Sequence, residues 1–360
     1  MMKLKLVLFG RGVGEGVLCN YDSDEWVIVD SCYGKNNSEK KAAALEYLEE
    51  NSISFDKVKL IVISHFHDDH IKGMLDIVRH CTSARIFVPE ALSTKEFVTY
   101  IATIADVNST TAPQQGVSEI FNIFYEAHNT EREIERTRAD VSLYFNQKNF
   151  ARVSALSPSN LECQETLAYF IEQVKTLNES VSLELPANVK KKNINNNCIT
   201  LCISGNVNSD ILLGADLEVS TNLKKGWSAL TATQHAPKNT ASVFKISHHG
   251  SVNGYCPVSW SKLAVTGTKP IGILTPYSRQ NLPRAEQIKV LQAVTSELYS
   301  TSPIKEYPLN KTDKKVLDEK RVESIARINL NFGYIELNEV SRNGSSWYDV
   351  KTVGAALKLQ

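Results

Sequence analysis

The chain has 360 residues, which is long enough for one large domain or two ordinary ones. Its hydrophobic fraction of 42% and charged fraction of 22% are typical of a soluble globular protein and argue against a disordered or fibrous chain. Forty Lys and Arg residues balance 40 Asp and Glu residues, so the net charge indicates no extended polyanion-binding surface, although a local basic groove stays open.

Alternating apolar residues predict strands over 3–9, 17–21 and 25–29. The glycine-rich segment 10–16 lies between two of these strands and opens no helix, so it lacks the geometry of a dinucleotide-binding loop and is interpreted as a hairpin turn. The strand over 25–29 ends at Asp30, which puts a carboxylate at its tip. Helical periodicity follows over 38–51.

The next apolar run, 58–63, predicts a buried strand that ends abruptly. Three histidines and two aspartates follow it within six positions. Imidazole nitrogens and carboxylate oxygens are the usual ligands of zinc and similar cations. Because the chain can turn at a strand end, the side chains of His65, His67, Asp69 and His70 can converge on one point. The segment therefore predicts a site for one or two zinc ions, with manganese as the alternative.

Beyond this motif, a helix is expected to begin at Ile71, and a strand covers 84–88. The region 95–195 is mostly helical by its pattern, with two strands. Its predicted helices cover 97–104, 117–138 and 161–177, its strands cover 141–145 and 152–156, and its loops cover 108–116 and 186–197.

The second half repeats the pattern of strands that end in polar residues. Strands are predicted over 198–203, 210–215, 242–246 and 270–276, followed by a helix over 284–299 and a β-rich part around 326–337. The second of these strands delivers Asp216, and the third delivers His248 and His249. In an open α/β structure such strand ends collect on one edge, where ligands bind. We therefore expect these residues to join Asp30 and the first histidine cluster.

Two further observations concern location. The seven cysteines are scattered and match neither a disulfide framework nor a paired-thiolate zinc site, which predicts reduced thiols in a cytoplasmic protein. No stretch approaches the length of a membrane span, and the first ten residues lack the apolar region and cleavage site of a signal peptide. No membrane partner is expected.

These motifs resemble the metallo-β-lactamase superfamily through the His-x-His-x-Asp-His pattern at 65–70, Asp30 and Asp216. The chain resembles the ComEC-like branch, a nuclease-type domain of competence DNA-uptake channels, more closely. Five segments carry that likeness: Gly-Glu-Gly at 14–16, Val-Asp-Ser at 29–31, Asn-Asn-Cys-Ile-Thr-Leu at 196–201, Leu-Leu-Gly-Ala-Asp-Leu-Glu at 212–218 and Ser-His-His-Gly-Ser at 247–251.

The resemblance implies an α/β fold, namely a four-layer αββα sandwich with a helical insertion and a two-metal site on its edge. Residues 1–94 and 196–360 would then be the two halves of one metallo-β-lactamase-type domain, the second with a β-rich C-terminal extension. Residues 95–195 would be a mostly helical insertion with two strands.

The resemblance also implies a ligand set for two cations: His65 and His67 for one, Asp69, His70 and one of His248 and His249 for the other, with Asp216 as the bridge. Asp30 is expected to orient a ligand histidine through its outer ring nitrogen. Asp69, His248 and His249 are the residues expected to take part in catalysis. The histidine of the pair that does not bind metal could donate a proton to the leaving group or contact a phosphate. A further histidine of the family is missing, because Ser157 stands where we expect it.

The implied function is metal-dependent hydrolysis by a metal-activated water, with a phosphodiester in nucleic acid or a nucleotide as substrate. A hydrolase of small esters, thioesters or lactams is the alternative, and a non-catalytic binding module is a further one. A di-iron redox enzyme is disfavoured, because that related branch carries a glutamate at the position of His67.

Overall fold

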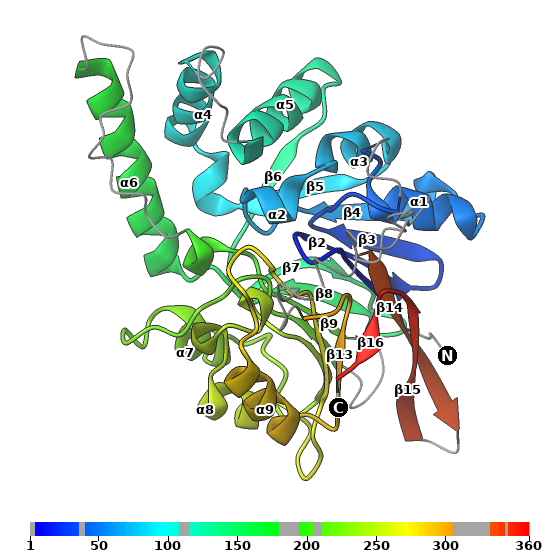
Figure 1. The fold of residues 1–360 in the computed structure, drawn as a ribbon. Helices are drawn as coiled ribbons and strands as arrows, with labels where there is room; N and C mark the ends of the chain where they lie inside the picture. The colour runs from blue at the N-terminus through cyan, green and yellow to red at the C-terminus, as the bar shows by residue number, and fades with distance from the viewer. Residues whose placement is uncertain are drawn as a thin grey trace, which may run out of the picture.

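The computed structural model describes residues 4–35, 40–107, 115–179, 194–204, 210–304, 332–342 and 345–359. Within these ranges the strands form two eight-stranded sheets that lie face to face (Figure 1). The order is β15-β14-β1-β2-β3-β4-β5-β6 in the first sheet and β16-β13-β12-β11-β10-β9-β8-β7 in the second.

The first sheet is antiparallel from β15 to β3 and parallel from β3 to β6. Because parallel strands point the same way, the carboxyl ends of β3 and β4 share one edge of the sheet. Its strands are β1 (Lys5–Gly10), β2 (Glu15–Asp22), β3 (Glu25–Val29), β4 (Val58–Val62), β5 (Arg85–Pro89), β6 (Ile134–Thr137), β14 (Gly333–Arg342) and β15 (Ser345–Gly354).

The second sheet is parallel from β10 to β13 and antiparallel on both sides of that block. The carboxyl ends of β10 and β11 therefore also lie together. Its strands are β7 (Val141–Phe145), β8 (Arg152–Ala155), β9 (Leu201–Ser204), β10 (Asp210–Leu213), β11 (Ala241–Lys245), β12 (Ile271–Leu274), β13 (Glu297–Ser300) and β16 (Leu357–Lys358).

Helices cover the outer face of each sheet (Figure 1). The first sheet is covered by α1 (Ala43–Glu50), α3 (Met74–His80), α4 (Lys95–Val107) and α5 (Gln115–Asn129), and α2 (Asp68–Ile71) lies at its edge. The second sheet is covered by α7 (Gly226–Thr231), α8 (Pro257–Leu263) and α9 (Ala285–Val294). The long helix α6 (Asn160–Glu179) packs against α4.

Strand alternation explains how these layers hold together. In β1, Leu6 and Leu8 point into the apolar cluster between the two sheets, whereas Val7 and Phe9 point into the cluster under the helices of the first sheet. A third apolar cluster joins the second sheet to its own helices. The four-layer αββα sandwich expected from the sequence is thus confirmed.

Some elements differ from the prediction. The helix expected over 38–51 begins only at Ala43, and the helix expected from Ile71 begins at Asp68 and breaks at Gly73, whose φ is 81°. Two segments predicted as helix ends are strands: Ile134–Thr137 pairs with β5, and Glu297–Ser300 pairs with β12. In both cases pairing with a strand distant in the sequence overrides the local preference.

Residues 108–114, 180–193 and 305–331, which contain most of two predicted loops and part of the β-rich segment, lie outside the described residues. Strands β6, β7 and β8 fall within 95–195 and extend the two sheets. The division at 94/95 and 195/196 stays a prediction.

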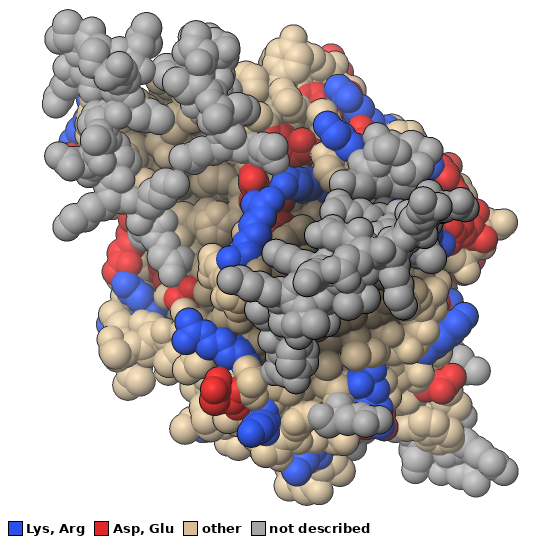
Figure 2. Space-filling model, in the orientation of Figure 1, with Lys and Arg blue, Asp and Glu red and all other residues tan. Residues whose placement is uncertain are grey.

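All seven cysteines are free thiols, and six of them are buried. In the part of the chain that the structure describes, no helix combines the length and apolarity needed to cross a membrane. On the face shown in Figure 2, the Lys and Arg side chains that are drawn alternate with Asp and Glu rather than forming one large basic area.

Candidate metal centre

The predicted residues come together where the strand ends of both sheets meet. His65, His67, Asp69 and His70 follow β4, Asp216 follows β10, and His249 follows β11. Three overlapping groups have their nitrogen and oxygen ligand atoms within 4.8 Å of one another: Glu15 with His70, Asp216 and His249; Asp30 with His65 and His70; and His65 with His67 and Asp216.

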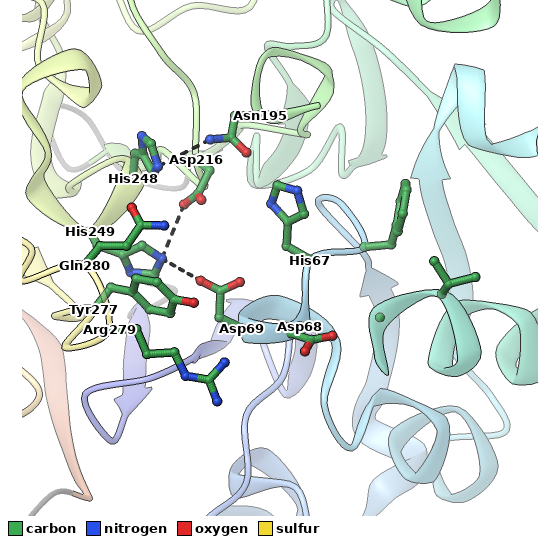
Figure 3. Close-up of a pocket in the computed structure, with 13 residues that line it drawn as sticks. His67, Asp68, Asp69, Asn195, Asp216, His248, His249, Tyr277, Arg279 and Gln280 are labelled. Carbon is green, nitrogen blue, oxygen red and sulfur yellow. Dashed lines mark hydrogen bonds and ion pairs between the residues drawn. The ribbon is translucent and has the colours of Figure 1, made fainter. Parts of the chain in front are cut away.

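Asp216 lies at the centre of this cluster (Figure 3). Its carboxylate oxygens are 3.3 Å from Nε2 of His70, 3.8 Å from Nε2 of His65 and 3.9 Å from Nε2 of His249. Asp69 approaches from the side of α2, with its Oδ2 atom 3.0 Å from Nε2 of His249 and 4.0 Å from Nε2 of His70. One central carboxylate thus faces three imidazole nitrogens, which is the arrangement expected of a bridging ligand.

The hydrogen-bond partners of the outer ring nitrogens, Nδ1, determine which nitrogen of each histidine carries the hydrogen. Nδ1 of His70 lies 2.8 Å from Oδ2 of Asp30, and Nδ1 of His249 lies 3.0 Å from the carbonyl oxygen of Thr275. Both partners can only accept, so each Nδ1 donates. Ser64 donates its hydroxyl to Asp30 at 2.6 Å, so Nδ1 of His65, 2.9 Å from that hydroxyl oxygen, is also the donor. In the neutral imidazoles, the lone pairs on Nε2 therefore all point inward.

Whether a cation fits this site depends on the atoms that point into it. Nε2 of His65, Nε2 of His70 and Oδ1 of Asp216 are buried, and none finds a hydrogen-bond partner among the described residues. Nitrogen lone pairs that face carboxylate oxygens across 3.3–3.9 Å leave costly unsatisfied groups unless an electron-pair acceptor lies between them. A divalent cation is such an acceptor, and this mixed nitrogen and oxygen set is one that zinc prefers.

Asp30 makes the contact that we expect of a residue that orients a ligand histidine. Besides its bond with His70, it accepts hydrogen bonds from the backbone N–H and the hydroxyl of Ser64. Its φ of 58° is in the left-handed region, as are the φ values of Ala215, His248 and His249, which are 41°, 47° and 53°. Such backbone strain costs about 1–3 kcal/mol per residue and concentrates at functional sites.

The charges of the cluster act strongly on one another. Burial acts to raise the pKa of the Asp216 carboxyl, but His70 and His249 outweigh it and hold that pKa well below its usual range. Burial likewise acts to lower the pKa of His70, but Asp216, Glu15 and Asp30 outweigh it and raise that pKa well above 6.5. The carboxylates thus attract positive charge into the site, whether that charge is a proton or a metal ion.

Sequence reasoning missed Glu15 and its partner Lys245. The two side chains are 2% and 1% exposed, and Nζ of Lys245 lies 2.5 Å from Oε1 of Glu15. Glu15 also accepts a hydrogen bond from the hydroxyl of Thr275 at 2.6 Å and lies 3.6 Å and 3.8 Å from Nδ1 of His70 and His249. It therefore contacts both histidines, and one of its oxygens belongs with Asp216 to a group of ligand atoms within 4.8 Å of one another. A lone lysine within the apolar strand β11 was the signal that could have pointed to a buried acid.

Two predicted positions lie apart from the cluster. His248 belongs to none of the three groups; its Nδ1 lies 3.2 Å from Oε1 of Glu218 and its Nε2 lies 3.3 Å from Nδ2 of Asn195. Ser157 donates to the carbonyl oxygen of Cys198 and accepts from the N–H of Thr200, so its hydroxyl supports the backbone. Of the pair after β11, His249 is the member that faces Asp216.

A cavity of about 360 Å³, the metal-side cavity, opens onto this cluster (Figure 3). Tyr277 stacks on His249 there, with ring centroids 5.1 Å apart and an interplanar angle of 22°. Arg279 and Asn195 also line the cavity, whereas the carboxylate of Asp68 points away from Asp216. The cavity size fits a small molecule or one unit of a longer substrate.

No protein-family model and no curated protein sequence matches this chain. Among solved structures, the chain is similar to MEM-A1, a subclass B3 metallo-β-lactamase from a soil metagenome library, at 10% identity and a TM-score of 0.35, over 67% of this chain and 75% of that one. It is also similar to LRA-12, a class B3 di-zinc metallo-β-lactamase from an Alaskan soil metagenome. That match has 11% identity and a TM-score of 0.32, and it covers 60% of this chain and 62% of that one.

A third similar structure is AbOPH, a hydrolase of the β-lactamase superfamily, at 12% identity and a TM-score of 0.31, over 58% of each chain. Likenesses of this degree give no information about substrate. The predicted family therefore depends on this chain's own motifs, and the ComEC-like branch stays a prediction. What the described residues do establish is an αββα sandwich that gathers buried histidine and carboxylate side chains able to hold a metal ion at one edge.

Proposed function

We propose that this protein is a metal-dependent hydrolase of phosphodiesters in nucleic acids or nucleotides, with zinc as its metal and manganese as the alternative. The observation that carries the hydrolase proposal is the convergence of unpartnered, buried lone pairs of His65, His70 and Asp216 beside an open cavity. When bound, divalent cations there supply Lewis acidity and lower the pKa of a water from about 15.7 to about 7.

We assign the ligands in two overlapping sets that share Asp216. His65 and His67 hold one cation, and His70, His249 and Asp69 hold the other. Burial acts to raise the pKa of the Asp69 carboxyl, but the hydrogen bond with His249 and the charge of His70 outweigh it, so Asp69 is ionised at neutral pH. Asp69 can therefore accept a proton at a carboxylate oxygen that borders the cavity.

The phosphodiester preference depends on the groups that line the metal-side cavity. Arg279 is exposed there, and none of the described carboxylates lies within ion-pair distance of its guanidinium. A guanidinium that has no carboxylate partner beside a hydrolytic site suits a phosphate, whose oxygens it can bind through two parallel hydrogen bonds.

His248 is placed to serve the leaving group. Oε1 of Glu218 lies 3.2 Å from its Nδ1, while the ring itself borders the metal-side cavity. An imidazole in this position can donate a proton to the leaving oxygen or contact a phosphate, and neither role needs a metal contact.

The test is a substrate panel with the metal-loaded protein. Single-stranded DNA, RNA, cyclic dinucleotides, bis(4-nitrophenyl) phosphate and 4-nitrophenyl acetate are incubated with zinc-loaded and manganese-loaded protein. We expect cleavage of phosphodiesters, its loss in Asp216→Asn, and a higher KM in Arg279→Gln. Cleavage of the carboxylic ester alone would refute the phosphodiester proposal and favour the small-molecule alternative. Failure to retain any metal would favour a binding module.

A further inference from the structure

A second pocket adjoins the metal-side cavity. This flanking pocket has a volume of about 610 Å³, and it shares two of its lining residues, His248 and Gln280, with the metal-side cavity. The two spaces are therefore separated by the histidine that we place beside the leaving group. A leaving group that receives a proton from His248 must lie next to the flanking pocket.

The polar side of the flanking pocket carries an unsatisfied donor. Gln287 lies in the first turn of α9 and is only 6% exposed, yet its Nε2 has no hydrogen-bond partner among the described residues. A buried amide without a partner carries a desolvation cost that a hydrogen bond to a ligand oxygen would offset. Gln287 lines the pocket, so a polar ligand there could give its amide a partner.

Positive charge lies beside that donor. Arg284 precedes α9 and is exposed, and no carboxylate in the described ranges lies within ion-pair distance of it. The amino end of α9, a ten-residue helix, adds the positive end of its dipole on the same side. Arg284 and the helix end together favour an anionic group such as a phosphate.

Apolar residues also line the flanking pocket. Val219 and Val252 line it and are 45% and 70% exposed. The N–H of Val219 donates to the carbonyl oxygen of Asn253 at 2.7 Å, so the two valine-bearing loops are fixed against each other. They offer an apolar surface on which the flat ring of a base can lie.

We propose that the flanking pocket binds the nucleoside on the leaving-group side of the scissile phosphate, together with the next phosphate. The base lies against Val219 and Val252, Gln287 donates to an oxygen of this nucleotide, and Arg284 binds the next phosphate. The inference rests on the proposed function and makes it narrower: the substrate is an oligonucleotide or dinucleotide, and an isolated phosphodiester fills only the metal-side cavity.

The first test compares two substrates across matched variants. We measure KM for an oligothymidylate and for bis(4-nitrophenyl) phosphate in wild type, Arg284→Gln, Val252→Asp and Lys289→Gln. Lys289 is an exposed lysine on the same helix that does not line the pocket, so its variant controls for loss of one positive charge. We expect Arg284→Gln to raise the ratio of the oligothymidylate KM to the bis(4-nitrophenyl) phosphate KM about tenfold, the loss of one charge-assisted contact. Val252→Asp should raise the same ratio, because it replaces an apolar contact with the base by a negative charge. Lys289→Gln should leave the ratio unchanged.

The second test needs no catalysis. Thymidine 5′-monophosphate and inorganic phosphate are titrated calorimetrically into protein kept metal-free with a chelator. We expect the nucleotide to bind more tightly than phosphate, Arg284→Gln to weaken the binding of both, and Val252→Asp to weaken the binding of the nucleotide more than that of phosphate. Equal KM ratios in all four proteins, or nucleotide affinity that both variants leave unchanged, would overturn the proposal. A wild type that binds the nucleotide in this way but cuts neither substrate would instead overturn the proposed function alone.

Discussion

Replacing Lys245 with methionine is expected to destabilise the protein severely, although we assign this residue to no metal. Its ammonium group is 2.5 Å from the Glu15 carboxylate and donates to the carbonyl oxygen of Ala215 at 3.1 Å. Both members of the pair are at most 2% exposed. Methionine fills a similar volume, so the main effect is electrostatic: the Glu15 carboxylate loses its closest cation in a place that water does not reach.

The size of the effect follows from burial. Removing one partner of a buried ion pair costs about 3–5 kcal/mol, because an uncompensated charge stays behind. Replacing both, with Glu15→Gln and Lys245→Met in one chain, leaves no such charge, and losses from paired replacement are close to zero in comparable cases. We therefore expect the double variant to be more stable than Lys245→Met alone, with a coupling energy of about 2 kcal/mol or more.

The assay is urea unfolding in the presence of a chelator, followed by the fluorescence of the four tryptophans. Equal slopes in all variants would allow the midpoints to be compared as free energies. Lys262→Met on α8 is the control, because Lys262 is exposed and its loss should change stability by less than about 0.5 kcal/mol. A Lys245→Met variant as stable as that control, or a double variant whose loss equals the sum of the single losses, would refute the reasoning.

Three other predictions concern the metal centre. Asp216→Asn should lower the metal content of protein purified without chelator, measured by mass spectrometry; wild-type content would contradict the bridging assignment. His249→Asn should lose metal while His248→Asn keeps it and loses kcat; equal metal loss in both would remove the distinction between them. The raised pKa of His70 stabilises the metal-free fold below pH 6.5 and ceases to do so as pH rises through the folded-state value, so metal-free protein should melt at lower temperature in alkaline buffer. The melting temperature of the metal-loaded protein should instead rise with pH, because cations bind the deprotonated ring. Identical dependence of the melting temperature on pH in the two forms would exclude this explanation.

Much of the fold could be predicted from alternation within strands. Leu6 and Phe9 of one strand face different apolar clusters. Such a strand needs apolar residues on both faces, and a short stretch of sequence is enough to show that pattern. The strand Ile134–Thr137 was missed because it forms the edge of its sheet and carries Glu135 and Arg136, which read locally as a solvated helix face. Its pairing with β5 is a long-range contact, which the local periodicity of the sequence cannot predict.

In the site, too, local pattern predicted some features and long-range contacts decided the others. Polar residues at strand tips were sufficient to gather His65, His70 and Asp216, because sheet geometry brings such tips together. Sequence alone left the choice between His248 and His249 open, because both follow one strand and a left-handed backbone turn decides which ring faces Asp216. Glu15 was not predicted as a site residue, because its role depends on an ion pair with Lys245, which lies 230 positions away in the sequence.

The place of the last strands has a consequence for biosynthesis. Strand β14 pairs with the whole length of β1, and β16 pairs with β13, so each sheet is completed by strands made after most of its other strands. Until β14 leaves the ribosome, the hydrogen-bonding edge of β1 has no partner and is open to wrong associations. We therefore expect newly made chains to acquire their cation only after β14 has paired with β1, and chaperones that shield β-strand edges to govern the yield of active protein.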